Sequence, residues 1–129
     1  MKKKFLIVIA DYYKDISRGL LNSAKEVLPN SSLIKVISVP GVFEIPVTIS
    51  KNIKKYDGFL ALGCVIKGQT PHFDFISHAS TDAIMKLSIE YRKPIGNGII
   101  TCLNMRQATA RKKKGREAAQ AVISVLSQK

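Results

Sequence analysis

Apolar and polar positions follow two different patterns along this chain. Short apolar runs rich in β-branched residues predict strands at 4–10, 33–39, 59–66 and 95–101. Between these runs, apolar residues recur every three or four positions, which predicts helices at 15–28, 43–53, 72–91, 104–111 and from 115 onward. Strands that alternate with helices and carry few polar residues predict a parallel sheet sandwiched between two layers of helices.

Each long helix has a predicted inward face, because its apolar residues fall on one side. Pro46 is tolerable only in the first turn of the second helix, since proline lacks the N–H that the helix interior needs. The inward faces are expected to consist of Ile16, Leu20 and Ala24 in the first helix, Ile76, Ala79, Ala83 and Leu87 in the longest, and Ala118, Val122, Val125 and Leu126 in the last.

The stretch FLALGCVIKGQTPHFD, residues 59–74, joins the most apolar strand to the longest helix. The strand stops at Lys67, and Pro71 fits the first helical turn, with Thr70 as the expected N-cap. In open α/β sheets, ligands bind beside the carboxyl ends of the strands, and a helix N-terminus favours an anion such as phosphate. Lys67, Thr70 and His72 add a cation, a hydroxyl and an imidazole, so the sequence predicts a ligand site here.

Two other strand ends should meet this junction at the same edge of the sheet. Tyr12 follows the first strand, and Phe43 and Glu44 follow the second. Aromatic rings beside polar groups would fit a flat heterocycle that forms hydrogen bonds, although ordinary packing would explain the rings as well. An imidazole can transfer a proton near neutral pH, which makes His72 a candidate acid–base group, while a purely structural role at the helix start is the alternative.

Composition narrows the class of protein. The chain has 129 residues, of which 46% are hydrophobic and 23% charged, and it contains no internal repeat or linker, so we expect one domain over residues 1–129. Lys and Arg number 21 against 9 Asp and Glu, which gives a formal net charge of +12. Such an excess favours anionic partners, such as phosphorylated metabolites or nucleic acid, but solubility alone explains it equally well.

The basic run at 111–116 is the only local argument for nucleic acid. It lacks interleaved aromatic residues, and no helix-turn-helix, KH or RNP motif accompanies it, so we expect no nucleic-acid partner. Cys64 and Cys102 fall in or at the end of apolar runs without the spacing of a zinc site, which is typical of a reduced cytosolic protein.

The chain starts with three lysines and the apolar run 5–10, a pattern that resembles the beginning of a signal peptide. The apolar run is too short for one, and no cleavage site follows it. No stretch approaches the length that spans a bilayer. We therefore expect a cytoplasmic protein with no membrane partner.

Two motifs resemble those of the lumazine synthase family. Residues 40–46, PGVFEIP, are similar to the family's PGxFEIP, and residues 63–74, GCVIKGQTPHFD, are similar to its GxVI-[RK]-G-x-T-x-H-[FY]-[DE]. Both motifs are long, their order and spacing match, and the resemblance extends over nearly the whole chain. It implies a three-layer α/β/α sandwich with a four-stranded parallel sheet in the flavodoxin-like order 2-1-3-4.

The resemblance also implies an enzyme, a transferase of riboflavin biosynthesis. Such enzymes condense 5-amino-6-(D-ribitylamino)uracil with 3,4-dihydroxy-2-butanone 4-phosphate to give 6,7-dimethyl-8-ribityllumazine, phosphate and water. No metal or organic cofactor is implied. One alternative is a non-catalytic relative that binds flavins or lumazines, which would not need residues for the leaving phosphate. The other is a basic RNA-associated protein, whose affinity would fall steeply with salt.

By this resemblance, each candidate site residue has an expected role. Tyr12 takes the position of the aromatic residue that stacks on the heterocycle, and His72 matches the residue proposed to transfer protons. The pocket for the pyrimidine ring and the ribityl chain is expected to be lined by Val42, Phe43, Glu44, Val65 and Ile66. Phosphate is expected to contact Gln69, Thr70 and Arg111, and Lys114 matches a lysine that contacts the substrate.

Three features depart from the family pattern. Asn97 stands where many members have Phe, which makes one wall of the pocket more polar. The connection between Arg111 and Lys114 is shorter than usual, and we expect the chain to lack the N-terminal arm of many members. In the family, the site lies between adjacent subunits of a pentamer, and the regions of Asn97, Arg111 and Lys114 come from the neighbour. The resemblance therefore implies a homopentamer.

Overall fold

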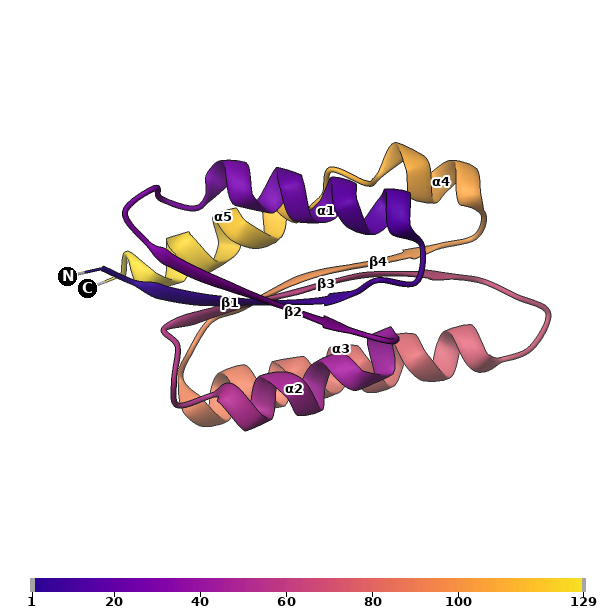
Figure 1. The fold of residues 1–129 in the computed structure, drawn as a ribbon. Helices are drawn as coiled ribbons and strands as arrows, with labels where there is room; N and C mark the ends of the chain where they lie inside the picture. Colours follow the sequence, from indigo (N-terminus) through magenta and orange to yellow (C-terminus); the bar gives the residue numbers. More distant parts are fainter. Residues whose placement is uncertain (1, 129) are drawn as a thin grey trace.

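The structure of the chain, a computed structural model that describes residues 2–128, contains one parallel sheet between two helix layers. The strands lie in the order β2-β1-β3-β4, which confirms the predicted topology. Figure 1 shows α1, α4 and α5 on one face of the sheet and α2 and α3 on the other. The elements are β1 (Lys4–Ala10), α1 (Lys14–Val27), β2 (Leu33–Val39), the 3₁₀ helix η1 (Val42–Glu44), α2 (Ile45–Asn52), β3 (Gly58–Ile66), α3 (His72–Tyr91), β4 (Ile95–Cys102), α4 (Met105–Ala110) and α5 (Gly115–Leu126).

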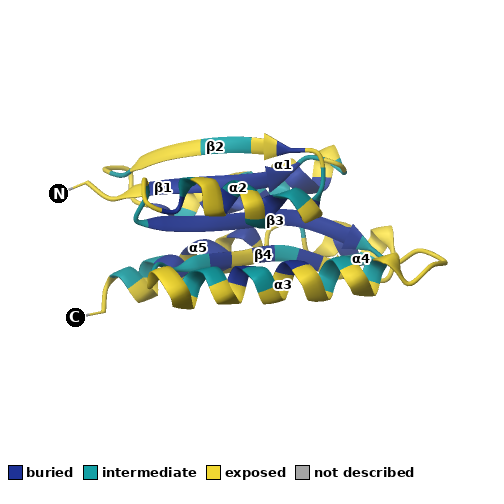
Figure 2. Ribbon diagram, turned by 90° about the horizontal axis from the view of Figure 1, so that it is seen from below, coloured by how far each residue is buried: buried dark blue, intermediate teal, exposed yellow. Residues whose placement is uncertain are grey.

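The two central strands, β1 and β3, are buried along almost their whole length, as Figure 2 shows. Because successive side chains of a strand point to opposite faces, the apolar run of β1 serves two cores. Phe5, Ile7 and Ile9 pack with α1 and α5. Leu6, Val8 and Ala10 pack with α2 and α3. An uninterrupted apolar run therefore reflects burial on both faces, as the parallel-sheet prediction required.

Strand β2 differs from the buried strands that the pattern predicted. It pairs only with β1, and its first three residues, Leu33, Ile34 and Lys35, are exposed. The sequence pattern of an apolar edge strand resembles that of a central strand, because both are rich in β-branched residues. Only the position of β2 at the edge of the sheet explains its exposure.

Three helices depart in detail from their predicted form. In α5, Val125, which the pattern placed inward, is exposed. The segment predicted as one helix over 43–53 divides into η1 and α2, with Pro46 in the first turn of α2, where a missing N–H costs nothing. In α3, Ser80 and Ile84 are buried, whereas Ala79, which the pattern placed inward, is exposed. Ser80 is small, and its hydroxyl donates to the carbonyl of Ile76 at 2.6 Å, so it can be buried without an unsatisfied polar group.

Helix α5 packs very closely on its neighbours, and glycine makes this possible. A Cβ atom at Gly96 of β4 would overlap the carbonyl oxygen of Ala118, and one at Gly115 would overlap that of Leu20 in α1. The connection from Arg111 to Lys114 is a single turn, in which the N–H of Lys114 donates to the carbonyl of Arg111 at 3.0 Å. The close contact of Gly115 with Leu20 holds the end of this connection against α1.

Candidate functional site at the carboxyl edge of the sheet

A pocket of about 330 Å³ opens at the carboxyl edge of the sheet. Its volume lies at the lower end of the range for small-molecule sites. Five of the predicted site residues contribute to it, and they come from the ends of β1 and β3, from η1 and from the start of α3. The lining residues are Tyr12, Tyr13, Gly41, Val42, Cys64, Val65, Ile66, His72 and Ile76.

A larger groove of about 420 Å³ lies at the opposite edge of the sheet, between the C-terminal ends of α3 and α5. Arg92 and Lys93 are its charged lining residues, and the remainder are uncharged. Within residues 2–128, no imidazole, carboxyl group or aromatic ring lines it. The residues that could carry out proton transfer or stacking therefore favour the smaller pocket.

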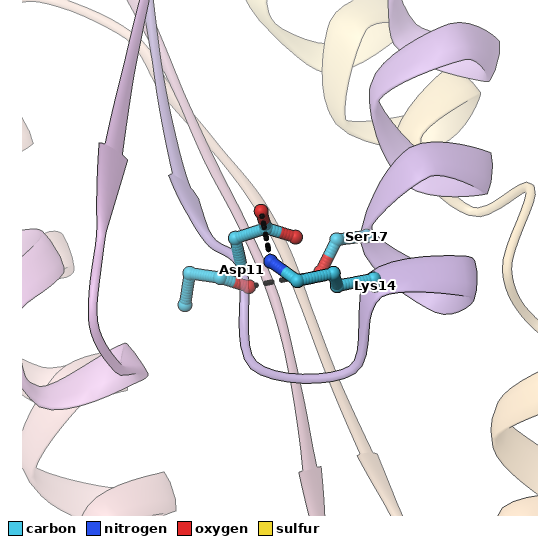
Figure 3. A network of polar contacts seen from close by, with 4 residues as sticks. Asp11, Lys14 and Ser17 are labelled. Atoms are coloured by element: carbon cyan, nitrogen blue, oxygen red, sulfur yellow. Dashed lines mark hydrogen bonds and ion pairs between the residues drawn. The ribbon is translucent and has the colours of Figure 1, made fainter.

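The turn between β1 and α1 holds Tyr12 at the mouth of the pocket. Figure 3 shows the contacts at its base, where the Ser17 hydroxyl donates to the carbonyl of Ala10 at 3.0 Å and Lys14 lies 3.2 Å from Asp11. The N–H of Asp11 also donates to the carbonyl of Val39 in β2 at 3.2 Å. The side chain of Tyr12 is 72% exposed, so its ring is accessible to a ligand.

His72 is the first residue of α3 and lies at the pocket wall. The residue that precedes the helix, in the N-cap position, is Pro71 rather than Thr70 as the sequence predicted. The hydroxyl of Thr70 accepts from the N–H of His72 at 3.4 Å, a long hydrogen bond. Gln69 and Thr70 are exposed on the connection before the helix and do not line the pocket.

The η1 segment contributes unequally to the site. Val42 is buried and lines the pocket. Phe43, expected at the same pocket, is 62% exposed and lines a separate groove between α2 and α3 that also includes Val47 and Ala79. Glu44 is half-buried at the end of η1, and its carbonyl accepts from the Thr48 hydroxyl at 2.8 Å.

Three further predicted site residues, besides those already described, lie outside the pocket of their own chain. Asn97 pairs with Ala61 well before the carboxyl end of β4, and its Oδ1 accepts from the N–H of Ile99 at 3.0 Å. The guanidinium of Arg111 lies 3.8 Å from the sulfur of Cys102. Lys114 forms an ion pair of 2.8 Å with Glu117. All three residues are exposed.

Four lining residues were not predicted as site residues from the sequence: Tyr13, Gly41, Cys64 and Ile76. Gly41 and Cys64 lie inside the two motifs, and Tyr13 is adjacent to Tyr12. Ile76 follows His72 by one helical turn, which places the two on the same face of α3. Position within a motif and helical spacing were therefore the available signals.

Burial changes the acidity of two side chains in this pocket. Burial of the Cys64 thiol, and to a lesser degree the neighbouring Cys102, raises its pKa from 9.0 to about 12. Burial also raises the pKa of Tyr13, with Cys64 and Tyr12 as further causes. Both groups are therefore neutral near physiological pH.

Among residues 2–128, no three His, Cys, Asp or Glu side chains gather as metal ligands would.

Cys64 should react slowly with iodoacetamide in the native protein at pH 8.5, because the thiolate is the reactive form. A pKa raised from 9.0 to about 12 lowers the thiolate fraction on the order of 10²- to 10³-fold relative to the unfolded chain. Mass spectrometry of native and urea-unfolded protein measures this difference, and equal labelling of Cys64 in both would contradict it.

The raised pKa of Cys64 also makes stability depend on pH. It stabilises the native state fully below pH 9, and this contribution is lost as the pH rises toward 12.

Comparison with known proteins gives one consistent match. The family model for 6,7-dimethyl-8-ribityllumazine synthase matches residues 2–129. A 6,7-dimethyl-8-ribityllumazine synthase of Agrobacterium fabrum is 42% identical over 99% of this chain and 95% of its own length. A protein with the same name from Bartonella bacilliformis is 42% identical over 96% of this chain and 88% of its own length. Another, from Corynebacterium kroppenstedtii, is 39% identical over 91% of this chain and 79% of its own length.

No helix within residues 2–128 is both long enough and apolar enough to cross a membrane.

Proposed function

The chain belongs to the 6,7-dimethyl-8-ribityllumazine synthase family, and we propose that the pocket beside Tyr12 and His72 is its reaction site. The enzyme condenses 5-amino-6-(D-ribitylamino)uracil with 3,4-dihydroxy-2-butanone 4-phosphate and releases 6,7-dimethyl-8-ribityllumazine, phosphate and water. The observation that carries the proposal is that an accessible aromatic ring, an apolar wall and an imidazole, from separate segments, line one pocket.

Tyr12 and the apolar wall hold the flat heterocycle. The exposed ring of Tyr12 lines the pocket, and Val42, Val65 and Ile66 form its apolar lining. A planar pyrimidine gains dispersion and stacking energy between such surfaces. Glu44 extends the contact surface toward the ribityl chain, whereas Phe43 lines the groove between α2 and α3.

His72 transfers the protons. The amine attacks the ketone to form a carbinolamine, which loses water to give an imine, so protons must move on and off oxygen and nitrogen. An imidazole does this near neutral pH. The position of His72 in the pocket wall gives its ring access to a bound substrate.

The N-terminus of α3 receives the phosphate. Free N–H groups at its first turn and the helix dipole favour an anion, and Gln69 and Thr70 lie on the connection directly before it. Arg111 adds a cation that stabilises the charge on phosphate as it leaves. Holding the two substrates together supplies much of the remaining rate acceleration.

An adjacent subunit completes the site. Arg111, Lys114 and Asn97 are exposed but do not line the pocket of their own chain, which supports their contribution to a neighbour's pocket in a homopentamer. The large apolar residues exposed on α2 and α3 support the same assembly, because a subunit interface would remove them from water. These residues are Val47, Phe75, Met85 and Ile89.

Asn97 gives the pocket wall a hydrogen-bond donor. Its Oδ1 already accepts from the N–H of Ile99, which leaves the amide nitrogen to donate to a ligand. A phenylalanine at this position would offer only an apolar surface. We therefore assign Asn97 a polar contact with the heterocycle bound by the neighbouring subunit.

Residues 1–129 form a single domain in this proposal, and the enzyme acts in the cytoplasm without a metal or organic cofactor. The two cores share one sheet, and both cysteines are free and buried, which suits a reducing compartment. Its partners are the two small-molecule substrates and its own subunits, not nucleic acid or a membrane.

A turnover assay tests this function. Purified protein is incubated with both substrates, and lumazine fluorescence and released phosphate are followed together. We expect the two products in equal amounts and neither product when the phosphorylated substrate is omitted. A folded, oligomeric sample that binds riboflavin but forms no lumazine would instead identify a non-catalytic flavin-binding relative.

A further inference from the structure

Tyr13 lies in the pocket, yet no role in the reaction accounts for it. It lines the pocket together with Tyr12, and it packs partly buried against the core between the sheet and α1. Its neighbour Tyr12 is 72% exposed. Two adjacent tyrosines thus occupy different environments, one fixed against the protein interior and the other open to a ligand.

The two rings contact one another in a defined geometry. Their centroids are 4.8 Å apart and their planes meet at 81°, an edge-to-face arrangement. This geometry is favoured because the electropositive edge of one ring meets the electronegative face of the other. An exposed ring held in this way has fewer orientations available before a ligand arrives, so less conformational entropy is lost on binding.

The backbone that carries Tyr13 is also fixed. The carbonyl of Tyr13 accepts from the N–H of Ser17 at 2.8 Å, and the Ser17 hydroxyl donates to the carbonyl of Ala10 at 3.0 Å (Figure 3). Ser17 therefore ties both ends of the turn to the first turn of α1. A ring contact from a fixed residue can restrain its neighbour, whereas a contact from a mobile residue could not.

We propose that Tyr13 is a positioning residue for the condensation, because its half-buried ring holds Tyr12 in the orientation that stacks on the heterocycle. This inference rests on the proposed stacking role of Tyr12. The edge-to-face contact requires the ring of Tyr13 and not its hydroxyl. Phenylalanine should therefore replace it, whereas an aliphatic side chain of similar bulk should not.

A double-mutant cycle with riboflavin as the probe tests the proposal. Tyr13→Leu should weaken riboflavin binding about three- to tenfold, reduce the quenching of bound flavin fluorescence and raise the KM for the amine substrate while kcat changes little. Tyr13→Phe should restore most of the binding. In a Tyr12→Ala background, Tyr13→Leu should cause no further loss. Tyr13→Met is the second variant if Tyr13→Leu does not fold.

Tyr56→Leu is the matched control, because Tyr56 forms a similar edge-to-face pair with Phe59, with centroids 6.1 Å apart, away from the pocket. It should leave riboflavin binding unchanged. Unchanged binding in Tyr13→Leu, or an equal loss with and without Tyr12, would overturn the positioning role alone. Unchanged binding in Tyr12→Ala would overturn the stacking role itself, and with it the role of Tyr13.

Discussion

Replacement of His72 by alanine is expected to lower kcat by about 10²- to 10⁴-fold, the range for loss of an acid–base group, while assembly and riboflavin binding persist. His72 is an exposed residue of the first turn of α3, and its ring faces a pocket rather than the core. Its removal therefore takes away a proton carrier without opening a cavity in the interior. Steady-state kinetics with both substrates at saturation measures the effect.

His78→Ala is the matched control, because His78 lies on the same helix and is also exposed but does not line the pocket. It should retain nearly full activity. Added imidazole should restore part of the kcat of His72→Ala, since a free imidazole can enter the vacated space and carry the proton. A kcat close to that of the unmodified protein in His72→Ala would remove His72 from the mechanism.

Replacement of Arg111 by alanine is expected to raise the KM for the phosphorylated substrate about 10- to 100-fold, which corresponds to the loss of a charge-assisted hydrogen bond. The KM for the ribitylaminouracil should change little, because the proposed substrate contact of the guanidinium is with the phosphate. The fold should tolerate the change, since Arg111 is exposed and its contact with the Cys102 sulfur, at 3.8 Å, is a weak one.

Arg106→Ala supplies the comparison for Arg111→Ala. Arg106 is an exposed arginine of the short helix α4, which Arg111 directly follows, and its removal changes the net charge equally. General attraction of an anionic substrate by the basic protein would make the two variants similar. A specific phosphate contact predicts a large effect for Arg111→Ala alone, and equal effects in both variants would contradict it.

Much of the fold follows from local pattern. The runs of β1 and β3 are apolar at every position because both faces of a central parallel strand are covered, and this is visible in the sequence. The exposure of β2 is not visible, because it depends on which strand ends up at the edge. The inward face of α3 was misread at Ala79 and Ser80, since a hydropathy pattern does not register a serine that satisfies its hydroxyl within its own helix.

The candidate site, like the fold, could be predicted from the sequence only in part. The two motifs were sufficient to identify Val42, Val65, Ile66 and His72 as residues of the pocket. Each lies at the end of a strand or on the short segment that follows it, and the sheet fixes the position of the strand end. Motif position did not identify Tyr13, because its proposed positioning role depends on the angle between its ring and that of Tyr12. It also could not show that Phe43 turns toward the groove between α2 and α3. The proposed contacts with another subunit lie beyond what a single chain's pattern encodes.

Completion of the pocket by an adjacent subunit is tested most directly by co-assembling His72→Ala and Arg111→Ala subunits in equal amounts and measuring lumazine formation at a low concentration of the phosphorylated substrate. In a ring with one heterologous interface per site, about a quarter of the sites then pair an intact His72 with an intact Arg111 from the neighbour. We predict activity near a quarter of that of the unmodified protein, well above either variant alone. Activity no higher than the average of the two separate variants would show that the two residues do not meet across an interface.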